Sequence, residues 1–325
     1  TSKGDWRSGR VKLEGKLGGT EVTAARFAVE GPLRMTDDGS GLHIPDEGPL
    51  SGAVDWAGDI STLLLFIPLP QHELSGQAAI ALTVGGTAAV PVLDGNVSLE
   101  DGRYENLETG TVLRDLALKA EVTKDRVDLV SLTASDGAGG GISGEGRLAL
   151  DAAKQFPFDV SIAFDKFHAL RRDDVTAVTG GTIQANGSLT APRIVGRLTT
   201  ETVEVSLSGA LPPDVVSLDV VEIKDGVVQE QPQQLEKGPT VDAMLDIVVE
   251  MPGRVFVRGR GLDSEWGGRI SVQGTSAEPA VSGEVKVVRG QLSVVGKPFK
   301  LKEGKVTLPK AAGSEPQLDV TAVNE

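Results

Sequence analysis

The stretch PFDVSIAF, residues 157–164, alternates large apolar side chains with small or charged ones. Because successive side chains of an extended chain point to opposite sides, its four large apolar residues share one side: Phe158, Val160, Ile162 and Phe164. Asp159 and Ser161 lie on the other side. This period of two predicts a β-strand with one apolar face and one wet face.

The same alternation recurs on both sides of this stretch. LRDLALKAEV, residues 113–122, places on one side Leu116, Leu118 and Val122. TVDAMLDIVVE, residues 240–250, does the same with Leu245, Ile247 and Val249. Towards the end of the chain the alternating apolar residues are Val285, Val287, Leu292, Val294, Phe299, Leu301, Val306 and Leu308. We expect these eighteen residues to line one continuous apolar surface.

Turn-forming residues separate the alternating segments, and no convincing amphipathic helix is present. Turn signals occur at DGR 101–103, TKD 123–125, KDG 224–226, RG 289–290 and EG 303–304. Strands joined by tight turns are antiparallel neighbours, and the spacing predicts about 25 to 30 strands of roughly ten residues. A single helical turn is conceivable in PPDVVSLDVV, residues 212–221. The predicted fold is all-β: a long antiparallel sheet folded over into an open groove with an apolar interior, like a β-taco or β-solenoid.

A Gly-Pro-Gly spacing occurs three times in the chain. Its copies are Gly86/Pro91/Gly95, Gly187/Pro192/Gly196 and Gly274/Pro279/Gly283. Glycine permits tight turns and close backbone approach, whereas proline is confined to strand starts, edges and bulges. A binding loop is the alternative, but the residues between the three landmarks differ from copy to copy. We therefore expect each copy to end one strand and begin the next.

The composition narrows the possible partners. Of the 325 residues, 39% are hydrophobic but only 4% are aromatic, and 41 are glycine, which favours β-structure. The net charge of −14 argues against nucleic acid and against adhesion to an anionic membrane through a basic patch. The chain has no cysteine, which excludes disulfides and thiolate metal sites.

One segment interrupts the alternation. VVQEQPQQLEKGP, residues 227–239, is polar and rich in glutamine, and we expect an exposed loop there. This divides the chain into groove repeats at 1–226, the loop at 227–239, and a continuation of the groove at 240–325. The longest apolar run, LLLFIPLP at 63–70, is far shorter than the roughly 20 residues that span a bilayer. The sequence has the character of a piece of a longer protein, so an anchor can lie outside it.

Reactive groups are sparse. His43, His72 and His168 are far apart and lack metal-ligand spacing, so we expect ordinary surface or rim histidines. The acidic pairs Asp37-Asp38, Asp46-Glu47 and Asp173-Asp174 do not match the helix–loop–helix calcium pattern and are expected to be solvated turns. SDGAGGGISG, residues 135–144, precedes a predicted strand and lacks the Lys-Ser/Thr ending of a phosphate loop. We predict neither an enzyme nor a cofactor or metal site.

One region resembles a known family. MPGRVFVRGRGLDSEWGGRISVQGTSAEPAVSGEVKVVRGQLSVVGKPFKLKEGKVTL, residues 251–308, is similar to the signature region of the TamB family. The features that match are the FVRGRGLDSEWGG run, the third Gly-Pro-Gly copy and the VRGQL that follows it. Residues 91–116 and 139–150 fit the same family style.

The resemblance implies a location, a fold and partners. TamB proteins belong to the translocation and assembly module of the Gram-negative envelope and are related to AsmA-like proteins. Members are anchored in the inner membrane and extend through the periplasm towards an outer-membrane barrel of the Omp85 type. The implied fold is a long β-sheet folded into a greasy groove. The implied ligands are phospholipid acyl chains and, in a second role, unfolded outer-membrane proteins. The family supplies no catalytic residues.

Three hypotheses follow for the function. The first is a periplasmic groove that conducts phospholipids between the two membranes. The second is an assembly factor for outer-membrane proteins and autotransporters, in which an exposed sheet edge pairs with a client strand. The third is a filled β-solenoid or sandwich of a stalk or adhesin. Alternation alone does not separate the first from the third, since a lined groove and a packed core use the same residues; the resemblance favours the first.

Overall fold

The computed structural model describes most of the chain. The described residues are 2–7, 10–18, 24–32, 34–35, 42–43, 45, 47–64, 71–87, 90–207, 223–224, 227–228, 242–310 and 315–324. The candidate helical turn at 212–221 and the acidic pair Asp37-Asp38 lie outside them. The expected polar loop at 227–239 also lies outside them, apart from residues 227–228.

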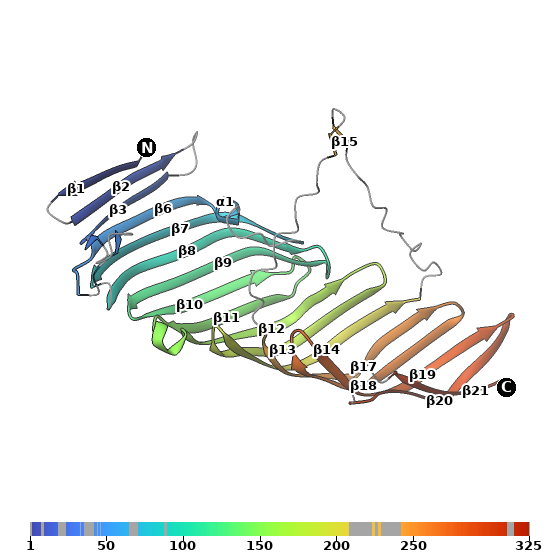
Figure 1. Cartoon of the computed structure of the whole chain (residues 1–325). Coiled ribbons are helices and arrows are strands. Elements are labelled where there is room, and N and C mark those ends of the chain that lie inside the picture. The colour runs from blue at the N-terminus through green and yellow to red at the C-terminus, as the bar shows by residue number, and fades with distance from the viewer. Residues whose placement is uncertain are drawn as a thin grey trace.

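Seventeen strands form one sheet, in which strands that follow each other in the sequence lie side by side (Figure 1). In spatial order they are β1 (Ser2–Arg7), β2 (Arg10–Gly18), β3 (Ala24–Pro32), β6 (Ser51–Asp59), β7 (His72–Gly86), β8 (Pro91–Asn106), β9 (Thr111–Lys124), β10 (Arg126–Ser135), β11 (Gly141–Ala149), β12 (Pro157–Arg171), β13 (Val175–Ser188), β14 (Ala191–Ser206), β17 (Met244–Gly259), β18 (Leu262–Thr275), β19 (Pro279–Val294), β20 (Lys297–Leu308) and β21 (Gln317–Val323).

The remaining elements are small. Two short strand pairs lie apart from this sheet: β4 (Arg34–Met35) with β5 (Leu42–His43), and β15 (Ile223–Lys224) with β16 (Val227–Val228). Among the described residues, the helical elements are α1 (Ser61–Leu64) and η1 (Ala152–Lys154). Within the described part of the chain, every helix is too short to cross a membrane.

The all-β prediction is confirmed, but the expectation of an antiparallel sheet throughout is wrong at one step. β14 and β17 are parallel, with Ile194 beside Leu245 and Val205 beside Val257. Parallel neighbours need a crossover of a dozen or more residues, and here the chain between Ser206 and Met244 provides it. The sheet therefore continues without a break from β14 to β17.

The strands are fewer and longer than predicted because some turn signals lie inside strands. β8 runs through DGR 101–103, where Asp101 has φ 51° and the register shifts between Leu99 and Gly102. β20 runs through EG 303–304, where the register shifts between Leu301 and Glu303. A β-bulge inserts one extra residue and bends the strand, and it accepts the same residues as a turn. TKD at 123–125 joins β9 and β10 as expected, and KDG at 224–226 lies at the step between β15 and β16, where Lys224 pairs with Val227.

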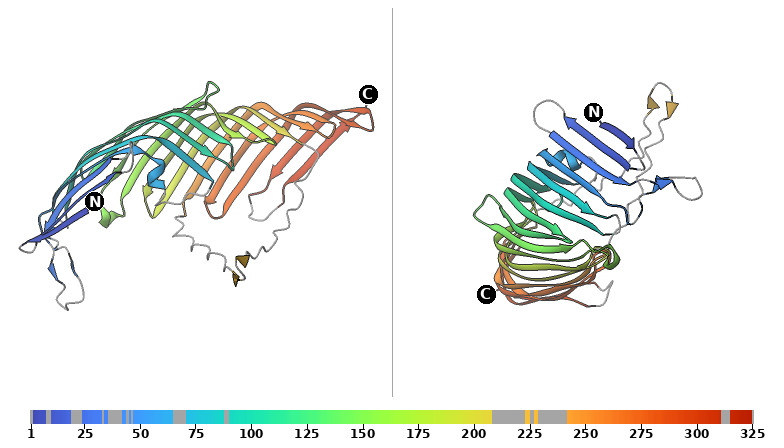
Figure 2. Two further views of the ribbon diagram at one scale, coloured as in Figure 1. Left: turned by 90° about the horizontal axis from the view of Figure 1, so that it is seen from above. Right: turned by 90° about the vertical axis from the view of Figure 1, so that its left-hand side faces the viewer.

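Bulges recur across the sheet and bend it. Similar shifts lie between Leu129 and Ser131 in β10, Phe164 and Phe167 in β12, Met251 and Val255 in β17, and Val287 and Arg289 in β19. Each of these four strands is thereby divided into two segments. Figure 2 shows the result, a curved sheet whose two ends do not meet.

The Gly-Pro-Gly units are hairpin landmarks, as predicted. In each copy the first glycine pairs with the proline across the turn: Gly86 with Pro91, Gly187 with Pro192, and Gly274 with Pro279. These glycines have φ of 78°, 117° and 93°, and a Cβ on them would lie 2.4–2.7 Å from the carbonyl oxygen of the residue before the proline. These turns lie at one end of the strands, and we call that side of the sheet the Gly-Pro rim. The β10–β11 and β19–β20 turns lie at the other end of the strands, which we call the opposite rim.

Candidate functional site: an apolar lane on one face of the sheet

A row of apolar residues crosses twelve neighbouring strands without interruption. Following the pairing register from β6 to β19, the row is Trp56, Ile80, Val97, Ala120, Leu129, Gly146, Val160, Ala185, Ile194, Leu245, Gly274 and Pro279. Residues paired directly across a sheet share a face. At about 4.8 Å between strands, this row is roughly 50 Å long.

The adjacent rows on the same face are equally apolar. Two positions nearer the opposite rim, the register gives Gly58, Ala78, Leu99, Leu118, Leu132, Gly144, Ile162, Ile183, Gly196, Ile247, Val272 and Val281. A further row contains Ala134, Ile142, Phe164, Gly181, Leu198, Val249, Ile270, Gly283 and Leu308. We call this surface the lane, and the side of the sheet that carries it the lane face.

The structure places the predicted lining residues on the lane face. Those that are less than a tenth exposed are Leu116, Val122 and Leu301. Those that are half-buried are Leu118, Phe158, Val160, Ile162, Phe164, Leu245, Ile247, Val249, Val285, Val287, Leu292, Phe299, Val306 and Leu308. Val294 differs, because it ends β19 at the opposite rim and is 46% exposed. Whether these residues bind lipid stays a prediction.

Two tryptophans that sequence reasoning did not select anchor the lane. Trp56 packs in a cluster with Leu99 and Leu116, and Trp266 packs with Met251 and Val255. The Trp266 indole N–H donates to the Ser264 hydroxyl at 2.8 Å, and that hydroxyl donates to the Val257 carbonyl oxygen at 3.2 Å. The polar atoms near Trp266 are therefore satisfied within the sheet. Val54, Trp56 and Gly58 are spaced two residues apart, and this period of two is the signal that could have identified Trp56.

The other side of the sheet, the charged face, has the opposite character. One residue away from the first apolar row, the register gives Asp55, Ala81, Asn96, Glu121, Asp128, Arg147, Asp159, Asn186 and Arg193. Asp128 accepts from the guanidinium groups of Arg126 and Arg147, each at 2.7 Å. Ion pairs of this exposed kind contribute little stability but keep the face wet.

The sheet is a single layer in its described part. Extensive contacts join each strand to its immediate neighbours, with a smaller contact between β9 and β12. A filled sandwich would need a second layer over the lane, and the described residues form none. The lane is thus an unclosed apolar surface, as expected for a groove.

A buried carboxylate joins β12 to the β10–β11 turn at the opposite rim. Asp136 is fully buried, and its carboxylate accepts from His168 Nδ1 at 2.6 Å and from the backbone N–H groups of Ala138, Gly140 and His168. Burial by itself would raise the pKa of Asp136, but these hydrogen bonds outweigh it and hold the pKa well below its usual range. The cluster holds the β10–β11 turn against β12. At this rim β10 and β11 are short, and the Thr111 hydroxyl of β9 donates directly to the Ala169 carbonyl oxygen of β12.

The histidines and acidic residues that were expected to have no catalytic role occupy the following places. His168 is a rim histidine, as expected, and its partner Asp136 comes from the glycine-rich stretch at 135–144, which precedes strand β11. His72 lies within 2.7 Å of the Tyr104 hydroxyl. The side chain of His43 lies outside the described set. Asp173 and Asp174 form an exposed turn between β12 and β13. Among the described residues, no group of three or more His, Asp or Glu side chains is placed to hold a metal ion.

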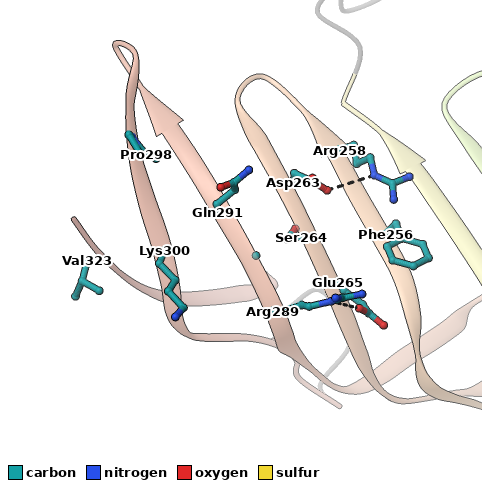
Figure 3. A pocket seen from close by; sticks show the side chains of 11 residues that line it. Phe256, Arg258, Asp263, Ser264, Glu265, Arg289, Gln291, Pro298, Lys300 and Val323 are labelled. Carbon is teal, nitrogen blue, oxygen red and sulfur yellow. Dashed lines mark hydrogen bonds and ion pairs between the residues drawn. The ribbon is translucent and has the colours of Figure 1, made fainter. Parts of the chain in front are cut away.

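A cavity of about 610 Å³ lies on the charged face near the C-terminal end of the described sheet (Figure 3). Its walls combine cations with acids: Arg258 contacts Asp263 at 3.3 Å, and Arg289 contacts Glu265 at 2.6 Å. Lys300 also lines it. Sequence reasoning did not find this cavity, because its residues come from five different strands.

The comparisons with known proteins agree with this geometry. The family model for the TamB C-terminal domain matches residues 130–325, which is more than half of the chain. No curated protein and no solved structure matches the chain. The matched region begins in β10 and contains the lane from there to β21, including the GRGLDSEWGG run that forms the β17–β18 turn and the Trp266 anchor. The chain is therefore a member of the TamB family of Gram-negative envelope proteins, which serve translocation and assembly.

Proposed function

We propose that this chain is a periplasmic segment of an envelope-spanning protein and that its lane conducts phospholipids between the inner and outer membranes. The observation that carries the proposal is the unbroken lane: twelve strands contribute only apolar side chains or glycine to each of two adjacent rows, and no second layer of described residues covers them. A surface of this length on a water-soluble sheet needs a ligand or partner to cover it.

The chemistry of the lane suits acyl chains. Its lining is mostly aliphatic, with few aromatic or polar groups that would fix one ligand geometry. Burying one methylene contributes about 0.8 kcal/mol, so a dozen methylenes give on the order of 10 kcal/mol before losses. That gain is distributed evenly along the lane, because one strand resembles the next. An acyl chain can therefore move by one strand spacing without losing a specific contact, while its headgroup stays in water.

Family membership suggests partners, and these are part of the same proposal. The lipid would enter at an anchor in the inner membrane and leave towards an outer-membrane barrel of the Omp85 type. The chain acts here as a carrier without catalytic groups, and no cofactor is needed for movement along a uniform surface.

The test is lipid binding by a variant with one charge in the lane. Ile162 lies in the middle of the second apolar row, between Gly144 and Ile183. Ile162→Asp places a carboxylate in the path, where an unpaired charge against hydrocarbon costs several kcal/mol. Ser161→Asp is the matched control, since it adds the same charge to the charged face of the same strand. Native mass spectrometry of the purified chain would measure co-purified phospholipid.

We expect phospholipid on the parent chain and on Ser161→Asp, and at least a tenfold loss on Ile162→Asp with unchanged circular dichroism. Equal lipid on both variants, or none on the parent chain, would contradict the proposal.

The second candidate, assembly of outer-membrane proteins, is favoured by a different feature. β21 pairs with β20 on one side, and its Leu318 and Val320 are 66% and 45% exposed. Among the described residues no strand pairs with the other edge of β21, and such an edge can pair with an unfolded client strand. Photo-crosslinkers at β21 that capture client peptide, with none capturing lipid in the lane, would favour this function over lipid transport.

A further inference from the structure

One hairpin of this acidic chain carries a local excess of positive charge. The net charge is −14, yet residues 286–310 contain seven lysines and arginines and one glutamate. This segment runs from the middle of β19 through the β19–β20 turn and β20 to Lys310. The overall charge argues against contact with an anionic surface, but electrostatic attraction acts over about 8–10 Å and depends on local charge. The hairpin is therefore a separate electrostatic region.

The tip of this hairpin holds an apolar side chain in an unfavourable conformation. Val294 pairs with Lys297, so Val295 and Gly296 form a two-residue turn, with φ of 49° and 76°. Turns of this type favour Asn-Gly or Asp-Gly, and a β-branched residue with positive φ is an outlier. Val295 is the one β-branched residue among the described non-glycine residues with positive φ.

Val295 is also 97% exposed, beside Val294 at 46%. The tip thus presents two apolar side chains to water, and the fold gains nothing from Val295 in this position. A conformational outlier of this kind points to a role outside the fold.

The lysines behind the tip are available for anions. Lys297, Lys300 and Lys302 are exposed, and among the described residues they have no ion pair within 4.0 Å. By contrast, Lys286 and Lys305 both contact Glu284. Lys300 lines the cavity of about 610 Å³ in Figure 3. Lys302 lines a second cavity of about 280 Å³ together with Lys286 and Lys305. Each cavity is lined by three cationic side chains, against two acidic side chains in the first and one in the second.

We propose that the β19–β20 hairpin is a membrane-docking element. Val294 and Val295 enter the headgroup–acyl boundary of an anionic phospholipid bilayer, and Lys297, Lys300 and Lys302 contact its phosphates. The lane face reaches the tip through Leu292, which pairs with Phe299. Docking would therefore place the end of the lane against the bilayer. The proposal deepens the proposed lipid function, but the docking itself does not depend on transport.

A bilayer fits these features better than an acidic protein does. Protein interfaces rely on aromatic residues and arginine held in well-packed pockets. The tip instead combines small aliphatic side chains with long, flexible lysines, the combination found in segments that lie in a membrane interface. No described aromatic side chain occupies the turn.

The test uses a fluorescent reporter at the tip of the full 325-residue chain. The chain has no cysteine, so Val295→Cys provides a single attachment site for an environment-sensitive dye. Val90→Cys is the control, since Val90 is 69% exposed in a hairpin turn of the Gly-Pro rim. We expect a blue shift at position 295 with phosphatidylglycerol vesicles and a much smaller one with phosphatidylcholine vesicles. Position 90 should show neither. No shift at 295, or equal shifts at both positions, overturns the proposal.

Two variants separate docking from folding. Val295→Asn relieves the turn, because asparagine accepts positive φ, so the hairpin should be at least as stable while vesicle binding falls. Changing Lys297, Lys300 and Lys302 together to glutamate should reduce binding to phosphatidylglycerol vesicles by at least tenfold, since each lysine near an anionic surface contributes roughly fivefold. The same change at Lys119, Lys124 and Lys154 is the control. Unchanged vesicle binding by Val295→Asn and the lysine variant would contradict docking by this hairpin.

A failure of membrane docking can be distinguished from a failure of lipid transport. Ile162→Asp alters the lane far from the hairpin, so it should lose co-purified phospholipid and keep its affinity for vesicles. The hairpin variants should keep co-purified phospholipid and lose affinity for vesicles. A chain that retains phospholipid in the lane but never binds vesicles would overturn docking and leave the transport proposal standing.

Discussion

Val160 and Asp159 are neighbours in one strand, yet they belong to surfaces of opposite chemistry. The row through Val160 crosses twelve strands with apolar residues and glycine, whereas the row through Asp159 crosses nine strands with charged or amide side chains at every position except Ala81. The backbone hydrogen bonds are common to both faces. The two faces therefore differ in side-chain chemistry although they share one hydrogen-bonded ladder, and they should respond differently to substitution.

The largest effect should come from filling a glycine position on the lane face. Gly95 has φ 152°, and a Cβ there would lie 2.0 Å from the Ala81 carbonyl oxygen on the next strand. Because both the strain and the contact oppose a side chain, Gly95→Val should cost about 3 kcal/mol or more, or prevent folding. Asn96→Val, on the charged face of the same strand, should change stability by less than about 1 kcal/mol. Urea unfolding followed by circular dichroism measures both, and similar costs would remove the distinction between the faces.

A smaller effect is expected from truncating a packed side chain. Leu116 is 8% exposed in the cluster around Trp56. Leu116→Ala should destabilise the chain by about 2–3 kcal/mol, at the lower end for buried leucines because the sheet is a single layer. Lys119→Ala, on the charged face of the same strand, should stay within about 0.5 kcal/mol. The urea midpoints of the two variants give the comparison, which fails if Lys119→Ala is the more damaging.

The third effect compares two carboxylates, one buried and one exposed. Asp136 accepts four hydrogen bonds in the rim cluster, and Asp136→Asn turns an amide N–H₂ towards some of those donors, which should cost about 2 kcal/mol. Asp128 sits between two arginines on the charged face, and Asp128→Asn should leave the melting temperature unchanged within error.

The pH dependence of the melting temperature gives a further test of the buried carboxylate. Because the pKa of Asp136 is lowered in the folded chain, its contribution is complete above the unfolded pKa of about 4 and is lost as the pH falls below that value. The melting temperature of the parent chain should therefore fall more steeply between pH 4 and pH 2.5 than that of Asp136→Asn. Parallel curves would show that the buried carboxylate does not contribute as described.

The sequence foretold the two faces but not how the sheet bends. Alternation in PFDVSIAF and its relatives identified the lane, since period two is a local property of an extended chain. The Gly-Pro-Gly copies likewise identified hairpins, because their backbone demands are local. DGR 101–103 could not be assigned, because a bulge and a turn accept the same residues.

Two further features depend on residues far apart in the chain. Asp136 and His168 are separated by 32 positions, and their contact arises only after β11 and β12 pair. The parallel step from β14 to β17 was missed for a similar reason, since strand direction after a long connection is set by packing and not by either strand's own sequence.

A crosslinking scan along β12 shows whether acyl chains occupy the lane face and not the charged face. A photoreactive amino acid would be placed singly at each position from 158 to 164, and crosslinked phospholipid would be measured by mass spectrometry. We expect adducts at Phe158, Val160, Ile162 and Phe164 and few at the three positions between them. Adducts of equal yield at all seven positions, or none at any of them, would contradict this expectation.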